Sequence, residues 1–505
     1  MNCIATQALV ASVMTNRSRR IGVAAALLCA LIVRVVNIDA HALWWDEIVS
    51  VSNATGSQLT APITRDGAAF TQADFWSGNS IATTYEASIQ DSGNSVLYYM
   101  MLHFWILAFG ISDFSVRLPS VIFGAILVVA IFALSHRTFG PRAAWAAAGL
   151  AVFHPLLVRY SQEARGHSLA TLFGVVGTWL FLEIAAANEQ SRSVGSRLGW
   201  VAYGLSAVGA ILAHYLSVAV FLGHILYAIF TVRRRSVWVR LVAAGCLAGL
   251  ALGVWFAHGG ARGLGAMSRM NAGYEERSQL MSADENFALP ATPRWIAAGA
   301  LQMLYAISGN LLQRSGLRLS ALLPLLSVPL TLLVFAWKGR GGGTRMWGLM
   351  LLLGVSNLAL AGILALRSGH IVSFQPHYGL FSTPYVVILM AVGLIHVLDA
   401  GRLRPAVLVV GGQLAIIVAS VLIVYQDIPL FRPPNPLRAT ARVVATSVTR
   451  GDEVVFESWY QARLINLYLP PSPPIRQRIA GDHPGTIAIV TDGNVRILVA
   501  EPRVF

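Results

Sequence analysis

The amino-acid sequence predicts a polytopic α-helical membrane protein. Of its 505 residues, 56% are hydrophobic and only 12% are charged, whereas about 25% of the residues in a soluble domain are charged. Apolar segments of about twenty residues, long enough to cross a bilayer as helices, recur along most of the chain. Basic residues cluster in short stretches between them, as in cytoplasmic loops. We therefore attribute the net charge of +14 to membrane topology and not to nucleic-acid binding.

The number of spans and their orientation follow from hydrophobic length and loop charge. The predicted spans are residues 20–38, 117–135, 142–158, 166–186, 198–216, 217–232, 238–258, 317–337, 346–366, 379–398 and 405–425. A cytoplasmic N-terminus places the short basic loops on the cytoplasmic side and the long loops in the periplasm of a bacterial inner membrane. The first span can also be interpreted as a signal peptide, but the many later spans favour an uncleaved anchor.

The remaining segments of the transmembrane domain, residues 1–425, form two large periplasmic loops. The first, 39–116, is polar with interspersed aromatics over 48–95, which favours an ordered loop that covers substrate. The second, 259–316, is polar over 260–294. The apolar stretches 96–109 and 295–312 are short for spans, so we predict periplasmic helices that lie in the membrane interface.

The tail, residues 426–505, has a different composition. A proline-rich linker is followed by a helical pattern over 438–449. Three short apolar runs then have the character of strands: 453–456, 487–490 and 495–499. We predict a small periplasmic α/β domain.

Two adjacent carboxylates stand directly after the first span. The stretch Trp44-Trp45-Asp46-Glu47 begins with indoles, which prefer the membrane–water interface. Two neighbouring acids cannot both ionise freely, so we expect one raised pKa, which suits a general base at a lipid surface. The alternative is an acidic, solvated start of a loop.

Several cationic or polar side chains are predicted near the same membrane surface. A guanidinium binds phosphate oxygens through two parallel N–H groups. The candidates for a phosphate are Arg34, Arg117, Arg159, Arg165, His377 and Tyr378. A sugar hydroxyl is the alternative ligand for His377 and Tyr378. The alternative for the arginines is anchoring or snorkelling at the headgroups, and Glu163 can pair with the nearby arginines.

No cofactor is predicted. The three cysteines are far apart, and no His or Cys spacing has the pattern of a metal site. A divalent metal is left open. His214, His224 and His258 lie in or beside apolar runs and are predicted to be structural.

The order and spacing of these motifs resemble a known family. The matching residues are Arg34, Leu43-Trp44-Trp45-Asp46-Glu47, Leu97-Tyr98-Tyr99 with His103, Val116-Arg117-Leu118-Pro119-Ser120, and Tyr160-Ser161-Gln162-Glu163-Ala164-Arg165. They resemble the bacterial family 39 transferases of glycosyltransferase superfamily C, which are similar to protein O-mannosyltransferases and lipid A aminoarabinose transferase. The match is dense over residues 20–185 and fades afterwards.

The resemblance implies a membrane enzyme with a lipid-linked substrate. Such enzymes take a sugar from a polyprenyl phosphate and transfer it, with inversion, to a hydroxyl of a lipid, glycan or protein. Asp46 would be the base beside Glu47, with Glu163 shaping the same site. Family members often have arginine where this chain has His377. The resemblance places four further residues near the substrate: Trp44, Tyr98, Tyr99 and His103.

Two other functions remain open at this point. A transporter or flippase of a polyprenyl-linked glycan would use the arginines but would need no base. A receptor-like or scaffolding membrane protein would need neither. Transporters tend to place polar residues at mid-span, whereas here they concentrate at one membrane face, which favours an interfacial enzyme.

Overall fold

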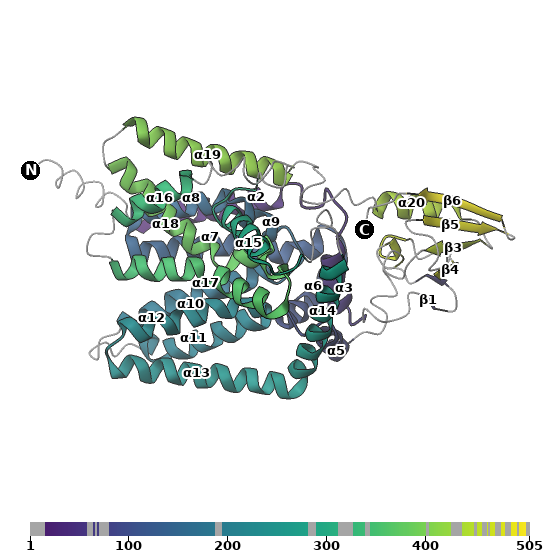
Figure 1. Ribbon diagram of the computed structural model, residues 1–505, viewed down its shortest axis with the longest axis horizontal. Helices are drawn as coiled ribbons and strands as arrows, with labels where there is room; N and C mark the ends of the chain where they lie inside the picture. Colours follow the sequence, from purple (N-terminus) through teal and green to yellow (C-terminus); the bar gives the residue numbers. More distant parts are fainter. Residues whose placement is uncertain are drawn as a thin grey trace, which may run out of the picture.

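The structure, a computed structural model, is dominated by long helices that run side by side along one axis (Figure 1). It describes residues 16–57, 64–65, 68–69, 80–186, 194–280, 289–311, 327–338, 344–399, 403–425, 437–448, 452–456, 462, 465–469, 476–479, 486–491 and 494–500. Within these residues, four helices are long and apolar enough to cross a membrane: 115–139, 167–186, 235–272 and 344–368. The chain therefore has the architecture of a multi-pass membrane protein.

Helices occupy each predicted span within the described residues, although the eighth, 317–337, is described only from residue 327. The bundle consists of α2 Asn16–Val35, α7 Leu118–Phe139, α8 Pro141–Phe153, α10 His167–Ala186, α11 Val194–Ala213, α12 Val218–Thr231, α13 Arg235–Trp255, α16 Ser327–Lys338, α17 Thr344–Ser368, α18 Thr383–Asp399 and α19 Leu403–Tyr425. Small side chains on α8, such as Ala144, Ala147 and Ala151, are fully buried and let α7 and α18 pack closely against it.

The prediction of one continuous span over 142–158 is wrong. Helix α8 ends at Phe153, His154 is extended (φ −63°, ψ 116°), and a short helix α9 runs from Pro155 to Ser161. Proline lacks the N–H that would continue the hydrogen-bond ladder, and it disfavours a helical residue before it. The break turns the chain toward the end of the bundle that carries Asp46.

The segments predicted as polar loops contain helices. The first loop holds α3 Trp45–Ala54 and α5 Ile81–Gln90, and the second holds α14 Ala261–Leu280. Polarity alone suggested loops, but Ala, Arg, Met, Glu and Gln are all good helix formers. The two predicted interfacial segments are helices, α6 Val96–Phe109 and α15 Pro293–Ile307.

The tail forms helix α20 Leu437–Ser447 and the predicted strands β3 Glu453–Phe456, β5 Thr486–Thr491 and β6 Asn494–Ala500. An unpredicted strand, β4 Arg476–Ile479, pairs parallel to β3, while β5 pairs antiparallel to β3 and β6. Two short strands of the first loop, β1 Thr64–Arg65 and β2 Ala68–Ala69, complete the order β1-β2-β4-β3-β5-β6. The mixed polarity of β4 hid it from the apolar pattern.

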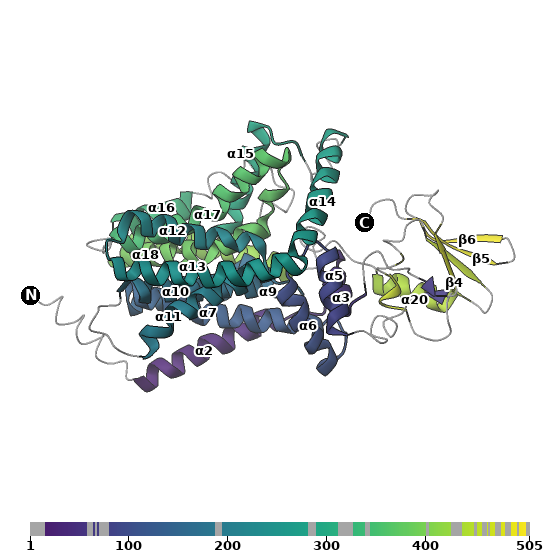
Figure 2. The same ribbon diagram turned by 90° about the horizontal axis from the view of Figure 1, so that it is seen from below.

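The two ends of the bundle differ in what covers them. At one end, α3, α5, α6 and α14 lie between the long helices and the tail sheet (Figures 1 and 2). Helices α7 and α10 both begin at this end, which we call the site end, and run to the opposite end, which we call the far end. Twenty helical residues span about 30 Å, which matches the hydrocarbon thickness of a bilayer.

Candidate active site

Asp46 lies in the first turn of α3, at the site end. A carboxylate is favoured there because the helix N-terminus carries partial positive charge. Its side chain is 32% exposed, and its Oδ2 lies 3.7 Å from Nη2 of Arg165. Nη1 of Arg165 also donates a hydrogen bond to the Asp46 carbonyl oxygen at 3.3 Å. Asp46 is therefore oriented by a cation and still open to a reactant.

Glu47, the next residue, is in the opposite situation. Its side chain is fully buried, and Oε1 accepts hydrogen bonds from Arg117 Nε (2.7 Å) and the Ala164 backbone N–H (2.9 Å). Oε2 accepts from Arg117 Nη2 (2.6 Å) and the Trp44 backbone N–H (3.2 Å). Both carboxylate oxygens are engaged, so Glu47 connects the start of α3 to the segment that carries Arg165.

Arg117 completes this buried pair. Besides Glu47, its guanidinium donates to the carbonyl oxygens of Ile38, His41 and Ala42 at 2.6, 2.9 and 3.2 Å. It is fully buried, and its bonds hold the connection between α2 and α3. This geometry suits a positioning role better than a phosphate ligand.

Arg34, on α2, is also fully buried. Its guanidinium donates to the carbonyl oxygens of Ala151 and Val152, both at 3.2 Å. These carbonyls end α8, where the break at Pro155 removes their helical partners. Nε donates to Ser161 Oγ at 3.2 Å. Arg34 therefore does not snorkel to the surface but caps a broken helix.

Arg159 and Glu163 form a second buried ion pair. Nη2 of Arg159 lies 3.0 Å from Oε1 of Glu163, with side chains 8% and 0% exposed. The segment that carries them approaches α7 closely: a Cβ on Gly124 would lie 2.0 Å from Ser161 Oγ at the end of α9, so a larger residue would displace this segment. The backbone of this segment continues directly to Arg165, whose N–H donates to the Glu163 carbonyl oxygen at 2.7 Å.

Arg165 is at the centre of a polar network. Its Nη1 donates to the Tyr99 hydroxyl at 3.0 Å, and that hydroxyl donates to Asp91 Oδ2 at 3.3 Å. Asn53 Nδ2 donates to the same oxygen at 2.8 Å. Burial raises the pKa of Asp91 to about 6, an effect that Arg165 opposes and Asp46 reinforces.

Asp91 and Asn53 were not predicted from the sequence. Asp91 is the C-cap of α5 and is followed by a tight turn in which Ser92 and Gly93 have φ of 71° and 66°. The signal that could have identified it is a short, turn-forming run, Asp91–Ser95, which only Val96 separates from Leu97-Tyr98-Tyr99.

His377 and Tyr378 reach the same neighbourhood from a distant part of the chain. They lie in a short helix, η7 Pro376–Phe381, with ring centroids 4.0 Å apart. The ring of His377 lies 5.2 Å from that of His167, and the ring of Tyr378 lies 5.7 Å from that of His214. Tyr378 is close enough to Arg165 to interact with it electrostatically. The structure therefore brings both predicted residues to Arg165, with two histidines beside them.

The other residues predicted near the substrate have mostly internal contacts. The Tyr98 hydroxyl lies 2.9 Å from Ser120 Oγ, and Nδ1 of His103 lies 2.9 Å from both Thr84 Oγ1 and the Ala54 carbonyl oxygen. Trp44 is half-buried at the N-cap of α3. Tyr99 differs from these three because its hydroxyl accepts a hydrogen bond from Arg165.

The described residues also bear on His224 and on possible metal ligands. The imidazole of His224 lies 2.9 Å from Thr178 Oγ1 and 3.2 Å from the Tyr203 hydroxyl, which confirms a structural role. Within the part of the chain that the structure describes, no group of three or more His, Cys, Asp or Glu is placed to hold a metal ion.

The tail domain contacts the segment just before Asp46. The Tyr468 hydroxyl donates to Asp113 Oδ1 and accepts from the Leu43 backbone N–H, both at 2.6 Å. Arg438 forms an ion pair with Asp113 and donates to the Asp39 carbonyl oxygen at 2.7 Å. We call Asp113, Arg438 and Tyr468 the tail clamp. It connects three segments that are far apart in the sequence.

Part of this site lies in a segment that matches a known family. Residues 94–257 match the family model described as dolichyl-phosphate-mannose-protein mannosyltransferase. The matched segment includes Tyr99, Arg117 and Arg165, while Asp46 precedes it. No curated protein matches the chain.

Solved structures share the fold over most of the chain. ArnT from Cupriavidus metallidurans bound to undecaprenyl phosphate is 12% identical, with a TM-score of 0.55 over 91% of this chain and 87% of ArnT. The archaeal oligosaccharyltransferase AglB from Archaeoglobus fulgidus, in complex with an inhibitory peptide and a dolichol-phosphate, is 11% identical with a TM-score of 0.50. That match covers 90% of this chain and 60% of AglB. These findings confirm the resemblance to O-mannosyltransferases and lipid A aminoarabinose transferase inferred from the motifs.

Proposed function

We propose that this chain is an inverting glycosyltransferase that moves a sugar from a polyprenyl-phosphate donor to an acceptor hydroxyl at the outer face of the cytoplasmic membrane. The observation that carries the proposal is the contrast between two adjacent acids. Asp46 is 32% exposed beside Arg165, while Glu47 is fully buried in an ion pair. The family match over 94–257 and the fold shared with polyprenyl-phosphate-bound ArnT support it.

In the proposed reaction Asp46 is the general base. The acceptor oxygen attacks the anomeric carbon, a new C–O bond forms, and the bond from that carbon to the phosphate oxygen breaks. The acceptor proton passes to the Asp46 carboxylate, and the bonding electron pair leaves with the lipid phosphate. A phosphate leaving group needs cations and not a proton donor, unlike the sugar alcohol released in glycoside hydrolysis. The acceptor is a lipid, glycan or protein.

The donor phosphate is assigned to Arg165. Its guanidinium is 15% exposed, and Tyr378 lies within electrostatic range of it, with His377 beside that tyrosine. We assign Arg34 and Arg117 to positioning because their guanidiniums are buried against backbone carbonyls. Arg159 and Glu163 shape the wall of the same site.

The test is transfer by membranes that contain the full chain, supplied with radiolabelled polyprenyl-phosphate sugars. We expect Asp46→Asn to lower the transfer rate by about 10²–10⁴-fold, the usual worth of a general base, without changing protein level. Arg165→Lys should retain more donor use than Arg165→Ala, because lysine keeps the charge but loses the bidentate fork.

Two controls separate the base from its neighbour. Glu47→Gln should reduce the amount of folded protein more than the rate per folded molecule, because its carboxylate is structural. Normal transfer by Asp46→Asn would remove Asp46 from the chemistry. If labelled glycan crosses the membrane without being transferred to an acceptor, the protein is a flippase and not a glycosyltransferase.

A further inference from the structure

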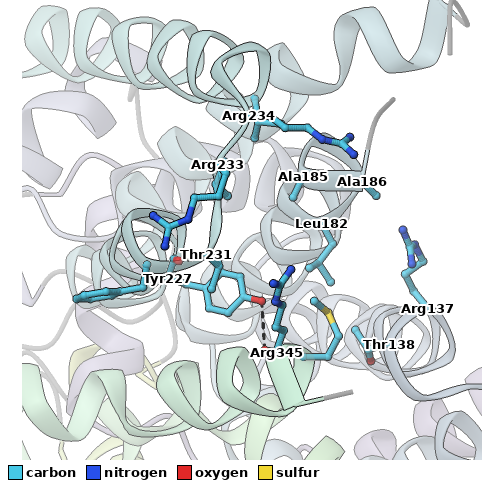
Figure 3. Close-up of a pocket in the computed structure, with 14 residues that line it drawn as sticks. Arg137, Thr138, Leu182, Ala185, Ala186, Tyr227, Thr231, Arg233, Arg234 and Arg345 are labelled. Carbon is cyan, nitrogen blue, oxygen red and sulfur yellow. Dashed lines mark hydrogen bonds between the residues drawn. The ribbon is translucent and has the colours of Figure 1, made fainter. Parts of the chain in front are cut away.

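A hollow at the far end of the bundle is surrounded by arginines. Its volume is about 600 Å³, and residues from α7, α10, α12, α13 and α17 line it. Figure 3 shows Arg137, Arg233, Arg234 and Arg345 spread around the opening. They come from three places: the end of α7, the connection between α12 and α13, and the start of α17. The proposed reaction does not use this hollow.

The hollow lies one bilayer thickness from the candidate active site. Helix α10 begins with His167 beside Tyr160 and His377 and ends with Ala185 and Ala186, which line the hollow. Its 20 residues span about 30 Å, close to the thickness of the hydrocarbon layer. The arginines are therefore at the depth of the headgroups of the other leaflet.

The arginine charges around the hollow exceed the acids that pair with them among the described residues. Arg137 pairs with Glu183, with 2.9 Å between Nε and Oε1, and both side chains are more than two-fifths exposed. Among the residues that the structure describes, neither Arg233 nor Arg345 forms an ion pair. A site with this excess of guanidiniums favours an anion, and phosphate oxygens suit the planar fork of arginine.

A hydrogen bond between two helices fixes the wall of the hollow that carries Arg345. The Tyr227 hydroxyl donates to the Arg345 carbonyl oxygen at 3.2 Å, and Thr231 Oγ1 donates to the Tyr227 carbonyl oxygen at 2.7 Å. The first bond joins α12 to the start of α17 (Figure 3), and the second lies within the last turn of α12. The backbone that carries Arg345 is thus fixed before a ligand arrives, which lowers the entropy lost on binding.

An exposed apolar stripe continues from the hollow along α12. Phe230, which lines the hollow, is 69% exposed, and Leu226 and Leu222 follow at 44% and 52%. Residues four apart lie on the same face of a helix. The three therefore form one exposed stripe that runs along α12 from the hollow toward mid-length. A ligand with a phosphate head and fatty chains would contact both the arginines and this stripe, whereas a free anion would contact only the arginines.

We propose that the hollow binds the headgroup of an anionic phospholipid, whose fatty chains lie along Leu222, Leu226 and Phe230 of α12. Basic pockets between transmembrane helices recognise such headgroups. Because guanidiniums from three separate parts of the chain surround the opening, a lipid with two phosphates, such as cardiolipin, fits better than one with a single phosphate. This site is independent of the sugar-transfer site.

The experiment is native mass spectrometry of the full-length chain in neutral detergent, titrated with cardiolipin or with zwitterionic phosphatidylcholine. We expect cardiolipin to bind and phosphatidylcholine not to compete with it. The double variant Arg233→Gln/Arg345→Gln should lower cardiolipin affinity about tenfold or more, given roughly 1 kcal/mol for each basic residue at a membrane surface. Arg235→Gln, compared with the single variant Arg233→Gln, is the matched control, since each removes one positive charge and Arg235 does not line the hollow.

Three outcomes would overturn the proposal. In the first, the double variant binds cardiolipin as the wild type does. In the second, Arg235→Gln weakens binding as much as a hollow-lining substitution, so that only general surface charge matters. In the third, pyrophosphate displaces cardiolipin at equal concentration, which would make the hollow a site for a free anion. If the glutamine variant fails to fold, Arg233→Lys/Arg345→Lys should still lose severalfold in affinity, and unchanged binding would contradict recognition by the guanidinium fork.

Discussion

Two arginine–carboxylate pairs with the same chemistry stand at opposite ends of the bundle. Arg117 donates two hydrogen bonds to Glu47 at the site end, at 2.7 and 2.6 Å. Arg142 donates two to Asp399 at the far end, at 3.0 and 2.7 Å. The first pair is fully buried, whereas the side chains of the second are 52% and 44% exposed. The two pairs therefore differ in their burial and not in the hydrogen bonds between the partners.

At the site end, ion pairs differ in burial and therefore in role. A buried pair is retained only if further hydrogen bonds satisfy both partners, and Glu47 and Arg117 obtain these from backbone groups before α3 and at Ala164. The Asp46–Arg165 pair is intermediate, with a 3.7 Å separation and partial exposure. Buried pairs thus form a scaffold that holds one accessible carboxylate at the surface of the site.

The largest expected effect comes from breaking each bidentate pair in turn. Glu47→Gln leaves the buried Arg117 charge without its counterion and should destabilise the protein by about 3–5 kcal/mol. Arg142→Gln, at the exposed pair, should cost about 0–1 kcal/mol. Thermal unfolding of both variants in one detergent measures the difference. Equal losses would mean that burial does not separate the two ends.

The tail clamp should have the next largest effect. Tyr468→Phe removes a hydrogen bond to the Asp113 carboxylate and one from the Leu43 backbone N–H. A hydrogen bond to a charged group contributes about 1.5–3 kcal/mol, so we expect a loss of stability in that range. The transfer rate should also fall, because residues 39–43 lead into Asp46. Thermal unfolding and the transfer assay on one preparation measure both effects.

Tyr85→Phe is the control for this chemical change. It also removes a tyrosine hydroxyl at the site end, but that hydroxyl donates an exposed 3.3 Å hydrogen bond to the neutral His258 carbonyl oxygen. A neutral hydrogen bond contributes about 0.5–1.5 kcal/mol, so the control should lose less stability than Tyr468→Phe. A wild-type rate and unfolding temperature in Tyr468→Phe would show that the tail does not support the site.

The smallest expected effect is a pH dependence that depends on Asp91. Its pKa is raised from 3.8 to about 6 in the folded protein, so between these values the folded state keeps a proton that the unfolded state has lost. The stability that this proton contributes is full below about pH 4 and is lost as the pH rises through about 6. From pH 5 to 7 the wild type should lose about 1 kcal/mol more than Asp91→Asn. Parallel curves of unfolding temperature against pH for the two proteins would contradict the raised pKa.

Much of the fold and part of the site could be predicted because they depend on local patterns. The 96–109 helix has the predicted bounds, since its apolar run is continuous and Gly110 ends it at φ 72°. The strands β3, β5 and β6 follow runs of Val and Ile. Asp46 and Arg165 were selected from short motifs at the predicted membrane surface, and their ion pair places both at the site end.

The tertiary structure decided which charges are scaffold and which are accessible. Asp46 and Glu47 are neighbours in the sequence, yet only the packing of Arg117, 70 residues away, makes Glu47 structural. Arg34 finds its carbonyl partners 117 and 118 residues away because Pro155 breaks α8. Sequence alone thus determined the hydrophobic lengths and the local motifs, which depend on near neighbours. The partner of a buried charge depends on which distant helices meet, and only the folded chain sets that.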